Sequence, residues 1–239
     1  MKAMILAAGL GTRLKPWTDH HPKALAPVNG KSLLQRNILY LQQYGIKEVV
    51  VNVHHFADQI IEAIETNHGW GSKIIISDET DAVLETGGGL KKAAPYFKGE
   101  EHIVLMNADI LTNMQLDQMM QQHKATAALA TLAVSQRNSS RYFLFGDDSL
   151  LKGWKHEGTG EVKPAGLNTD GLHSRAFSGI HVIQQGLFDK IQQTGKFSMV
   201  DVYLALCGTE HIYGFDHTGA LLLDVGKPES LTKAANLFP

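Results

Sequence analysis

The chain has 239 residues, of which 44% are hydrophobic and 19% are charged, a composition typical of a globular protein with a buried core. Its net charge of -2 at pH 7 argues against a general binder of nucleic acid or anionic membranes, because such proteins usually carry a basic excess. The single cysteine, Cys207, rules out an internal disulfide and a cysteine-based zinc site. No segment reaches the roughly 20 apolar residues of a membrane helix, and the apolar run 3–8 is too short for a signal peptide. We therefore expect a cytoplasmic protein that binds neither nucleic acid nor membrane.

Strand and helix patterns alternate through the first half of the chain. Continuous apolar runs predict buried strands at residues 3–8, 48–53, 73–77 and 103–106. Apolar residues at helical spacing predict helices at residues 33–44, 56–68 and 89–94. This alternation implies an α/β fold, a Rossmann-like mixed and mostly parallel sheet flanked by helices. In such a sheet the ligand lies beyond the carboxyl ends of the strands.

The second half of the chain is less regular. Its strand-like segments lie at residues 127–134, 141–145, 150–154 and 176–183. We expect these segments to extend the same sheet, so that residues 1–239 form a single domain. Residues 155–173 are rich in Gly, Thr, Lys and Asn, which predicts a mobile loop over the site.

A glycine-rich segment follows the first predicted strand directly. It reads Leu6-Ala7-Ala8-Gly9-Leu10-Gly11-Thr12-Arg13-Leu14, with Pro22-Lys23 further along. Glycines at the end of a strand let backbone N–H groups approach phosphate oxygens. Arg13 and Lys23 add cationic donors suited to phosphate. Gly-x-Gly alone also occurs in ordinary turns, but the Thr-Arg and Pro-Lys pairs that follow favour phosphate binding.

Two other glycine motifs do not fit this segment. A dinucleotide fingerprint needs a third glycine where Leu14 stands, and an acid at the end of the second strand, where the chain has Asn52 and His54. A P-loop needs Gly-Lys-Ser or Gly-Lys-Thr, which does not follow these glycines.

Two aspartates follow apolar strands far apart in the sequence. Asn107-Ala108-Asp109 comes after the strand 103–106, and Asp224 comes after Leu221-Leu222-Leu223. Either aspartate alone could be a turn or capping residue, but the pair in matching contexts favours a metal site. Because the hard cation Mg²⁺ prefers oxygen ligands and few protein carboxylates, we expect Mg²⁺ as the cofactor.

A second glycine-rich segment, Glu85-Thr86-Gly87-Gly88-Gly89, precedes the predicted helix 89–94. As a loop it exposes backbone groups that could read the edge of a nucleobase. The alternative is a turn that leads into the helix with Thr86 as its cap. The nucleobase interpretation is slightly favoured.

Together these motifs resemble the signature of the sugar-1-phosphate nucleotidyltransferases over most of the chain. Within that family, the chain is most similar to the short N-acetylmuramate-1-phosphate uridylyltransferases. The segments that carry this closer resemblance are Leu84-Glu85-Thr86-Gly87-Gly88-Gly89, Asn107-Ala108-Asp109, Phe177-Ser178-Gly179-Ile180, and Asp224-Val225-Gly226 with Glu229. The family commonly has Gly-Asp where this chain has Ala108-Asp109, and residues 135–175 match its pattern poorly.

The resemblance implies transfer of a nucleotidyl group from a nucleoside triphosphate, UTP, to the sugar 1-phosphate of N-acetylmuramic acid, with release of pyrophosphate. It implies nucleotide binding by Ala7, Ala8, Gly9, Gly11, Thr12, Arg13, Lys23, Gly87 and Gly88. It implies sugar binding by Glu85, Asn107, Ser178 and Gly179. Catalysis is assigned to Lys23, Arg13 and Asp109, and Mg²⁺ binding to Asp109 and Asp224.

Other substrates fit the same motifs. They are mannose or heptose 1-phosphate with GTP, and glucose 1-phosphate with UTP or TTP. A nucleotide-binding regulatory protein that has lost turnover is expected to lack Lys23 or one of the two acids, and all three are present. No general base is required, since a phosphate monoester with a second pKa near ~6 is mostly dianionic at neutral pH. The sequence gives no indication of the oligomeric state.

Overall fold

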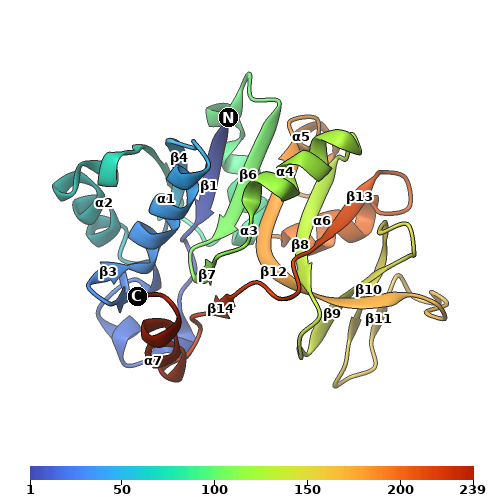
Figure 1. Ribbon diagram of the computed structural model, residues 1–239. Coiled ribbons are helices and arrows are strands. Elements are labelled where there is room, and N and C mark those ends of the chain that lie inside the picture. The colour runs from blue at the N-terminus through green and yellow to red at the C-terminus, as the bar shows by residue number, and fades with distance from the viewer.

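The computed structural model describes residues 1–239, and its centre is a ten-stranded mixed sheet (Figure 1). Four neighbouring strands, in the order β6-β1-β4-β5, pair in parallel. Their bounds are Lys2–Leu6 (β1), Glu48–Val53 (β4), Lys73–Asp78 (β5) and His102–Asn107 (β6). These strands are rich in Val, Ile and Leu because helices cover both faces of a parallel sheet.

The other half of the sheet is organised by one long strand, β12 (His173–Gln184), which pairs antiparallel with β6, β8 and β9. The remaining strands are Ala130–Ser135 (β8), Arg141–Phe145 (β9), Leu151–His156 (β10), Val162–Lys163 (β11) and Ile212–Asp216 (β13). The register of β12 against β8 shifts between Phe177 and His181. Such a bulge bends a strand, and β9, β10 and β11 lie at the lower right of Figure 1, away from β1 and β4.

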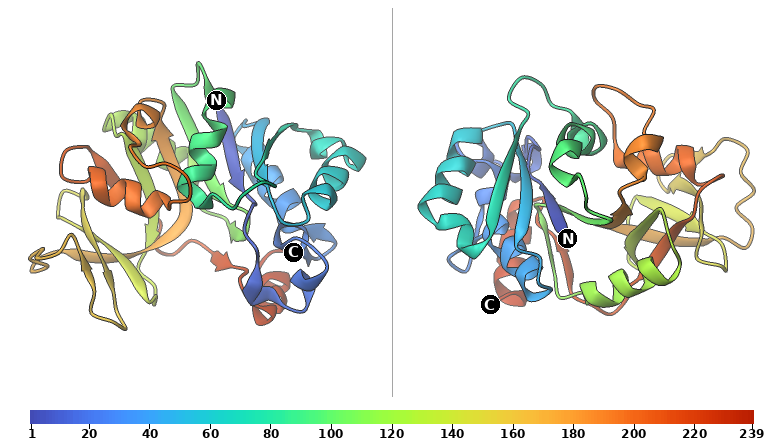
Figure 2. Two further views of the ribbon diagram at one scale, coloured as in Figure 1. Left: turned by 180° about the vertical axis from the view of Figure 1, so that it is seen from behind. Right: turned by 90° about the horizontal axis from the view of Figure 1, so that it is seen from above.

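Helices cover both faces of this sheet (Figure 2). One face carries α1 (Leu33–Gln43), α2 (Ala57–Thr66) and α4 (Leu116–Ala125). The opposite face carries α3 (Glu85–Ala93), α5 (Leu187–Lys190) and α6 (Met199–Leu206). Each face of the sheet has its own hydrophobic core. Ala3 and Ile5 of β1 belong to the core beneath α1, α2 and α4, and Met4 belongs to the core on the opposite face. This alternation follows from the two-residue period of a strand.

A small third core lies below the main sheet, where the C-terminal helix α7 (Pro228–Leu237) meets two short antiparallel ladders. These ladders are β2 (Pro27–Val28) with β3 (Lys31–Ser32), and β7 (Ile110–Thr112) with β14 (Leu222–Asp224). The core residues are Leu14, Ala26, Val28, Leu33, Leu111, Val225 and Ala234. This core anchors the segments that flank the carboxyl ends of β1 and β6.

The structure confirms the predicted fold class and the predicted strands of both halves, with parallel pairing in the central strands. None of the helices combines the length and the apolar character that a membrane span requires. Two predictions are wrong. The helix predicted at 89–94 begins at Glu85. Residues 155–173 consist mostly of turns and loops around the short strand β11, as predicted, but they do not lie over the site, because none of them lines the active-site cavity.

Several elements had no counterpart in the sequence analysis. They are β2, β3, β7, β11, β13, α4, α5, α6 and α7. Helix α4 carries a recognisable signal, since its buried residues Leu116, Met119, Met120 and His123 recur at helical spacing. Helix α6 contains Val200, Val202 and Tyr203, residue types that favour strands, and its burial against β12 and β10 decides its conformation.

Candidate active site

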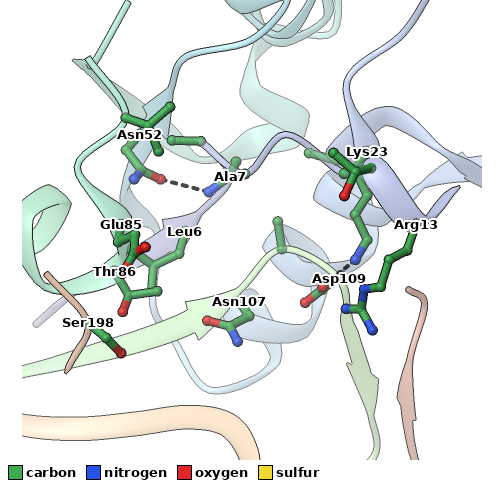
Figure 3. A pocket seen from close by; sticks show the side chains of 17 residues that line it. Leu6, Ala7, Arg13, Lys23, Asn52, Glu85, Thr86, Asn107, Asp109 and Ser198 are labelled. Atoms are coloured by element: carbon green, nitrogen blue, oxygen red, sulfur yellow. Dashed lines mark hydrogen bonds and ion pairs between the residues drawn. The ribbon is translucent and has the colours of Figure 1, made fainter. Parts of the chain in front are cut away.

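A cavity of about 390 Å³ lies at the carboxyl ends of β1, β4 and β6 (Figure 3). Seventeen residues line it, and ten of them were predicted from the sequence as site residues. These ten are Ala7, Ala8, Gly9, Gly11, Thr12, Arg13, Lys23, Glu85, Asn107 and Asp109. The other predicted residues, Gly87, Gly88, Ser178, Gly179 and Asp224, do not line it.

The two glycines of the first segment serve different purposes. Gly11 adopts φ +63°, and a Cβ there would lie 2.9 Å from the Cβ of Lys23, so glycine is required for both conformation and space. Gly9 has no atom within 4 Å of the place where a Cβ would be. Its surface therefore remains open for a ligand to approach the backbone. Beyond Gly11 the chain forms short 3₁₀ turns at Thr12–Leu14, Trp17–Asp19 and Lys23–Leu25.

Lys23 and Asp109 form an ion pair between Nζ and Oδ2. Both side chains are largely covered, with 13% and 22% of their surface exposed. Arg13, by contrast, is 62% exposed and its Nη2 lies 4.0 Å from Oδ2 of Asp224. Arg13 is thus free to move toward a ligand, whereas Lys23 is held in place by its partner.

The turn that carries Asp109 is held from three elements. The Ala108 N–H donates to the carbonyl of Leu6 at 3.1 Å. On α1, the buried amide of Asn37 donates to the carbonyl of Ala108 at 3.0 Å. From the C-terminal region, the Val225 N–H donates to the carbonyl of Asp109 at 2.8 Å. The aspartate is therefore presented by a fixed backbone.

Asp224 reaches the same place by a route that the sequence analysis did not foresee. It ends an apolar strand, but that strand is β14, which lies outside the main sheet. There Asp224 pairs with Ile110 of β7. The neighbouring Asp109 nevertheless lies close. Partial burial and the negative charge of Asp109 raise the pKa of the Asp224 carboxyl, against the opposing charges of Lys23, Arg13 and Arg137. The structure thus brings the two predicted acids together.

The two carboxylates offer oxygen ligands of the kind that hard divalent cations prefer. No group of three or more His, Cys, Asp or Glu side chains is arranged to hold a metal ion, which speaks against a zinc-type site. Mg²⁺ is commonly held by one or two carboxylates together with water and substrate phosphates. The unfavourable proximity of Asp109 and Asp224 is the kind of arrangement that a cation relieves.

The opposite side of the cavity contains a buried polar pair that sequence analysis missed. Asn52 accepts a hydrogen bond from the Ala7 N–H at 2.7 Å and donates to Oε1 of Glu79 at 2.8 Å. Glu79 is 1% exposed, its Oε2 has no partner, and burial raises the pKa of its carboxyl. The signal in the sequence is a single polar residue, Asn52, within the apolar run of β4.

The second glycine segment is not the open loop that was expected. Gly87 and Gly88 lie in the first turn of α3, and both N–H groups donate to the carbonyl of Phe197, at 2.9 and 3.2 Å. A Cβ at Gly87 would overlap the ring of Phe197, and one at Gly88 would overlap the carbonyl oxygen of Gly195. These glycines permit close packing of α3, and their N–H groups are already occupied by the carbonyl of Phe197. Their role in recognising the nucleobase stays a prediction.

The four residues predicted to bind sugar occupy different positions. Glu85 and Asn107 line the cavity. Gly179 adopts φ +74° in the bulge of β12, and a Cβ there would lie 2.9 Å from Nδ2 of Asn107. Ser178 is fully buried, with its Oγ hydrogen-bonded to Nε2 of His217 at 2.7 Å. Its hydroxyl is directed into the protein, and its role in sugar binding stays a prediction.

The sequence pattern of the nucleotidyl transferase family matches residues 2–238. The chain belongs to this family. It is 32% identical, over 99% of its length and 98% of the other protein, to the N-acetylmuramate alpha-1-phosphate uridylyltransferase of Neisseria meningitidis serogroup B. It is 29% identical, over 98% and 96% of the two chains, to the D-glycero-alpha-D-manno-heptose 1-phosphate guanylyltransferase of Aneurinibacillus thermoaerophilus.

The fold of this nucleotidyltransferase is also similar to solved structures. HddC from Yersinia pseudotuberculosis superposes with a TM-score of 0.81 at 23% identity, over 100% of this chain and 99% of the other. The motif resemblance is therefore confirmed, and the chain is a sugar-1-phosphate nucleotidyltransferase. Substrates of this enzyme class are a nucleoside triphosphate and a sugar 1-phosphate.

Proposed function

We propose that this enzyme transfers a uridylyl group from UTP to N-acetylmuramic acid 1-phosphate and releases pyrophosphate. The observation that carries the choice of substrates is the 32% identity to a uridylyltransferase of that sugar phosphate along nearly the full length of both chains. One continuous sheet supports residues 1–239 acting as a single catalytic domain. We further propose a cytoplasmic location, because nucleoside triphosphates are made and kept there, with neither nucleic acid nor membrane as a partner.

In the proposed reaction an oxygen of the sugar 1-phosphate attacks the α-phosphorus of UTP, and the bond to pyrophosphate breaks. The nucleophile is already anionic at neutral pH, so no side chain has to remove a proton. The main obstacle is the repulsion between two polyanions. Arg13 and Lys23 reduce this repulsion, and the backbone at Gly9 and Gly11 offers N–H groups to the phosphates.

Mg²⁺ is the proposed cofactor, with Asp109 and Asp224 as its protein ligands. When bound, the ion would neutralise phosphate charge and align the triphosphate. The Asp109 turn is fixed by Leu6, Asn37 and Val225, so this carboxylate needs little rearrangement when the substrates arrive. The Lys23 ammonium holds the Asp109 carboxylate in place meanwhile.

The test is a matrix of UTP, GTP, CTP, TTP and ATP against several sugar 1-phosphates, read by pyrophosphate release. We expect turnover only when triphosphate, sugar 1-phosphate and Mg²⁺ are all present, with UTP and N-acetylmuramic acid 1-phosphate giving the highest kcat/KM. Turnover that persists in EDTA would refute the proposed cofactor. Inactivity across the whole matrix would instead favour a nucleotide-binding regulatory protein.

A second candidate is guanylyl transfer to a heptose 1-phosphate, favoured by the relative at 29% identity. A preference for GTP with heptose or mannose 1-phosphate in the same matrix would select it. A preference for glucose 1-phosphate with UTP or TTP would select the remaining alternative.

A further inference from the structure

A second hollow, of about 560 Å³, lies on the connection between β8 and β9, and no part of the catalytic scheme above uses it. Only one of its eight lining residues is hydrophobic, so it suits a polar ligand. Its charged residues are Arg137, Lys155 and Glu157. Lys155 and Glu157 neutralise each other through an ion pair of 3.0 Å. Arg137 therefore decides the charge of the hollow.

The guanidinium of Arg137 is held in place but is not neutralised. The segment that carries it is fixed where the Gln136 N–H donates to Oγ1 of Thr218 at 2.8 Å. Nη2 of Arg137 donates to the carbonyl of Phe177 at 2.8 Å, and no carboxylate lies within 4.0 Å of the guanidinium. A guanidinium has five N–H donors, so most of those on Arg137 remain available to an anionic ligand.

Arg137 stands next to the region where the sugar is expected. Phe177, its backbone partner, begins the bulge of β12. Two residues later, a Cβ at Gly179 would lie 2.9 Å from Nδ2 of Asn107, which lines the active-site cavity. The charge of Arg137 also acts on Asp224. A ligand that extends from the cavity along the bulge therefore meets Arg137. Arg13 and Lys23, the residues proposed above to bind the triphosphate, line the active-site cavity and not this hollow.

We propose that Arg137 determines specificity for a sugar 1-phosphate that carries an acidic substituent, by binding its carboxylate. This inference rests on the proposed function and names the substituent of the sugar that Arg137 recognises. A guanidinium matches the two oxygens of a carboxylate and forms a charge-assisted pair with it. N-acetylmuramic acid differs from N-acetylglucosamine by a lactyl ether that carries such a carboxylate. A neutral sugar leaves the Arg137 donors without a partner.

The experiment compares kcat/KM for two matched pairs of sugar 1-phosphates, each with its preferred triphosphate. One pair is N-acetylmuramic acid and N-acetylglucosamine 1-phosphate, and the other is glucuronic acid and glucose 1-phosphate. In Arg137→Gln we expect kcat/KM for the preferred acidic sugar to fall roughly 10- to 100-fold, the value of a charged hydrogen-bonded pair. The value of kcat/KM for the neutral member of each pair should change less than about twofold. Arg137→Lys should keep part of the preference, because it keeps the charge but not the forked geometry.

Arg141→Gln is the matched control, since Arg141 is an exposed arginine four residues away that forms no ion pair and lines neither cavity. Arg141→Gln should leave kcat/KM unchanged for both pairs of sugar 1-phosphates. The inference is overturned if Arg137→Gln lowers kcat/KM equally for acidic and neutral members, or for neither.

The outcomes separate this inference from the proposed function. If the wild type prefers N-acetylmuramic acid 1-phosphate and Arg137→Gln keeps that preference, only the role of Arg137 fails. If the wild type prefers glucuronic acid 1-phosphate and Arg137→Gln loses the preference, Arg137 reads the acid and the proposed sugar is wrong. A wild type that prefers the neutral member of both pairs overturns both.

Discussion

Gly9 lines the active-site cavity and leaves open space where a Cβ would be, whereas Gly88 lies in α3 behind the lining residues Glu85 and Thr86, and a Cβ there would overlap the carbonyl oxygen of Gly195. We call these the Lys23 side (Gly9, Gly11, Arg13, Lys23, Asp109) and the α3 side (Asn52, Glu79, Gly87, Gly88, Phe197). The Lys23 side consists of charged groups and free backbone. The α3 side consists of buried hydrogen bonds and close packing. Similar glycine-rich sequences thus provide ligand access on one side and tight packing on the other.

The largest expected effects lie on the Lys23 side, at its two acids. Asp109→Asn and Asp224→Asn should each lower kcat on the order of 10³-fold, because each weakens the binding of a cation worth several kcal/mol to the transition state. If both residues hold one ion, the double mutant is far less than multiplicatively worse than either single mutant. Pyrophosphate release at increasing Mg²⁺ measures this, with the exposed Asp147→Asn as control. Fully multiplicative losses would mean that the two acids have separate roles.

The next largest effect is expected for the lysine. Lys23→Ala should lower kcat by roughly 100-fold or more, because its charge acts on the transferring phosphate in the transition state. The protein should still fold, with a loss of about 1–3 kcal/mol in stability, because the largely covered Asp109 carboxylate loses its charged partner. Lys15→Ala is the matched control, as Lys15 is an exposed lysine of the same loop, paired with Asp19. A folded Lys23→Ala protein with unchanged kcat would remove Lys23 from the catalytic residues.

Substitutions of Gly88 and Gly9 test the difference between the α3 side and the Lys23 side directly. Gly88→Ala should reduce the free energy of unfolding by about 1–3 kcal/mol, because the added methyl group forces α3 and Gly195 apart. Gly9→Ala should change it by less than about 0.5 kcal/mol while lowering kcat/KM, because the methyl group occupies space left for the ligand. Urea denaturation and pyrophosphate release measure the two effects. Equal destabilisation by both substitutions would show that the two sides do not differ in this way.

The smallest effect concerns Asp224 and stability. Its pKa is raised in the folded state, so the folded protein binds this proton more tightly than the unfolded chain and loses stability as pH rises through that range. Asp224→Asn should therefore be slightly more stable than the wild type at pH 7 without metal. The gain should be less than about 1 kcal/mol, because the side chain is 49% exposed to screening solvent. It should vanish as pH falls below the ordinary value of 3.8. A destabilised Asp224→Asn at pH 7 would contradict this sign.

The sequence predicts the Lys23 side well because its signals are local. A continuous apolar strand ends at two glycines, and the direction of the parallel strands places Gly9 and Asp109 at one edge. The α3 side depends on partners distant in sequence. Nothing near Gly87 reveals that Phe197 will accept its N–H. Asp224 is likewise placed by a distant partner, because β14 pairs with β7, directly after Asp109.

Arg137 and Asn52 show two further limits. Arg137 lies in a stretch without any motif, and only the bulge of β12 brings it near Asn107. In the sequence alone, Asn52 indicates only that the chain lacks a dinucleotide fingerprint. Its hydrogen bonds to Ala7 and Glu79 arise from the pairing of β4 with β1 and with β5, which the sequence predicts only as adjacency and not as contact between particular atoms.

The β7–β14 ladder has a consequence for the order in which the enzyme matures. During synthesis, Arg13, Lys23 and Asp109 leave the ribosome long before Asp224, and the backbone bond from Val225 to Asp109 cannot form until β14 has emerged. A nascent chain can therefore assemble the parallel half of its sheet while still lacking one of its two acids. The growing polypeptide holds no complete carboxylate pair until β14 has left the ribosome and paired with β7.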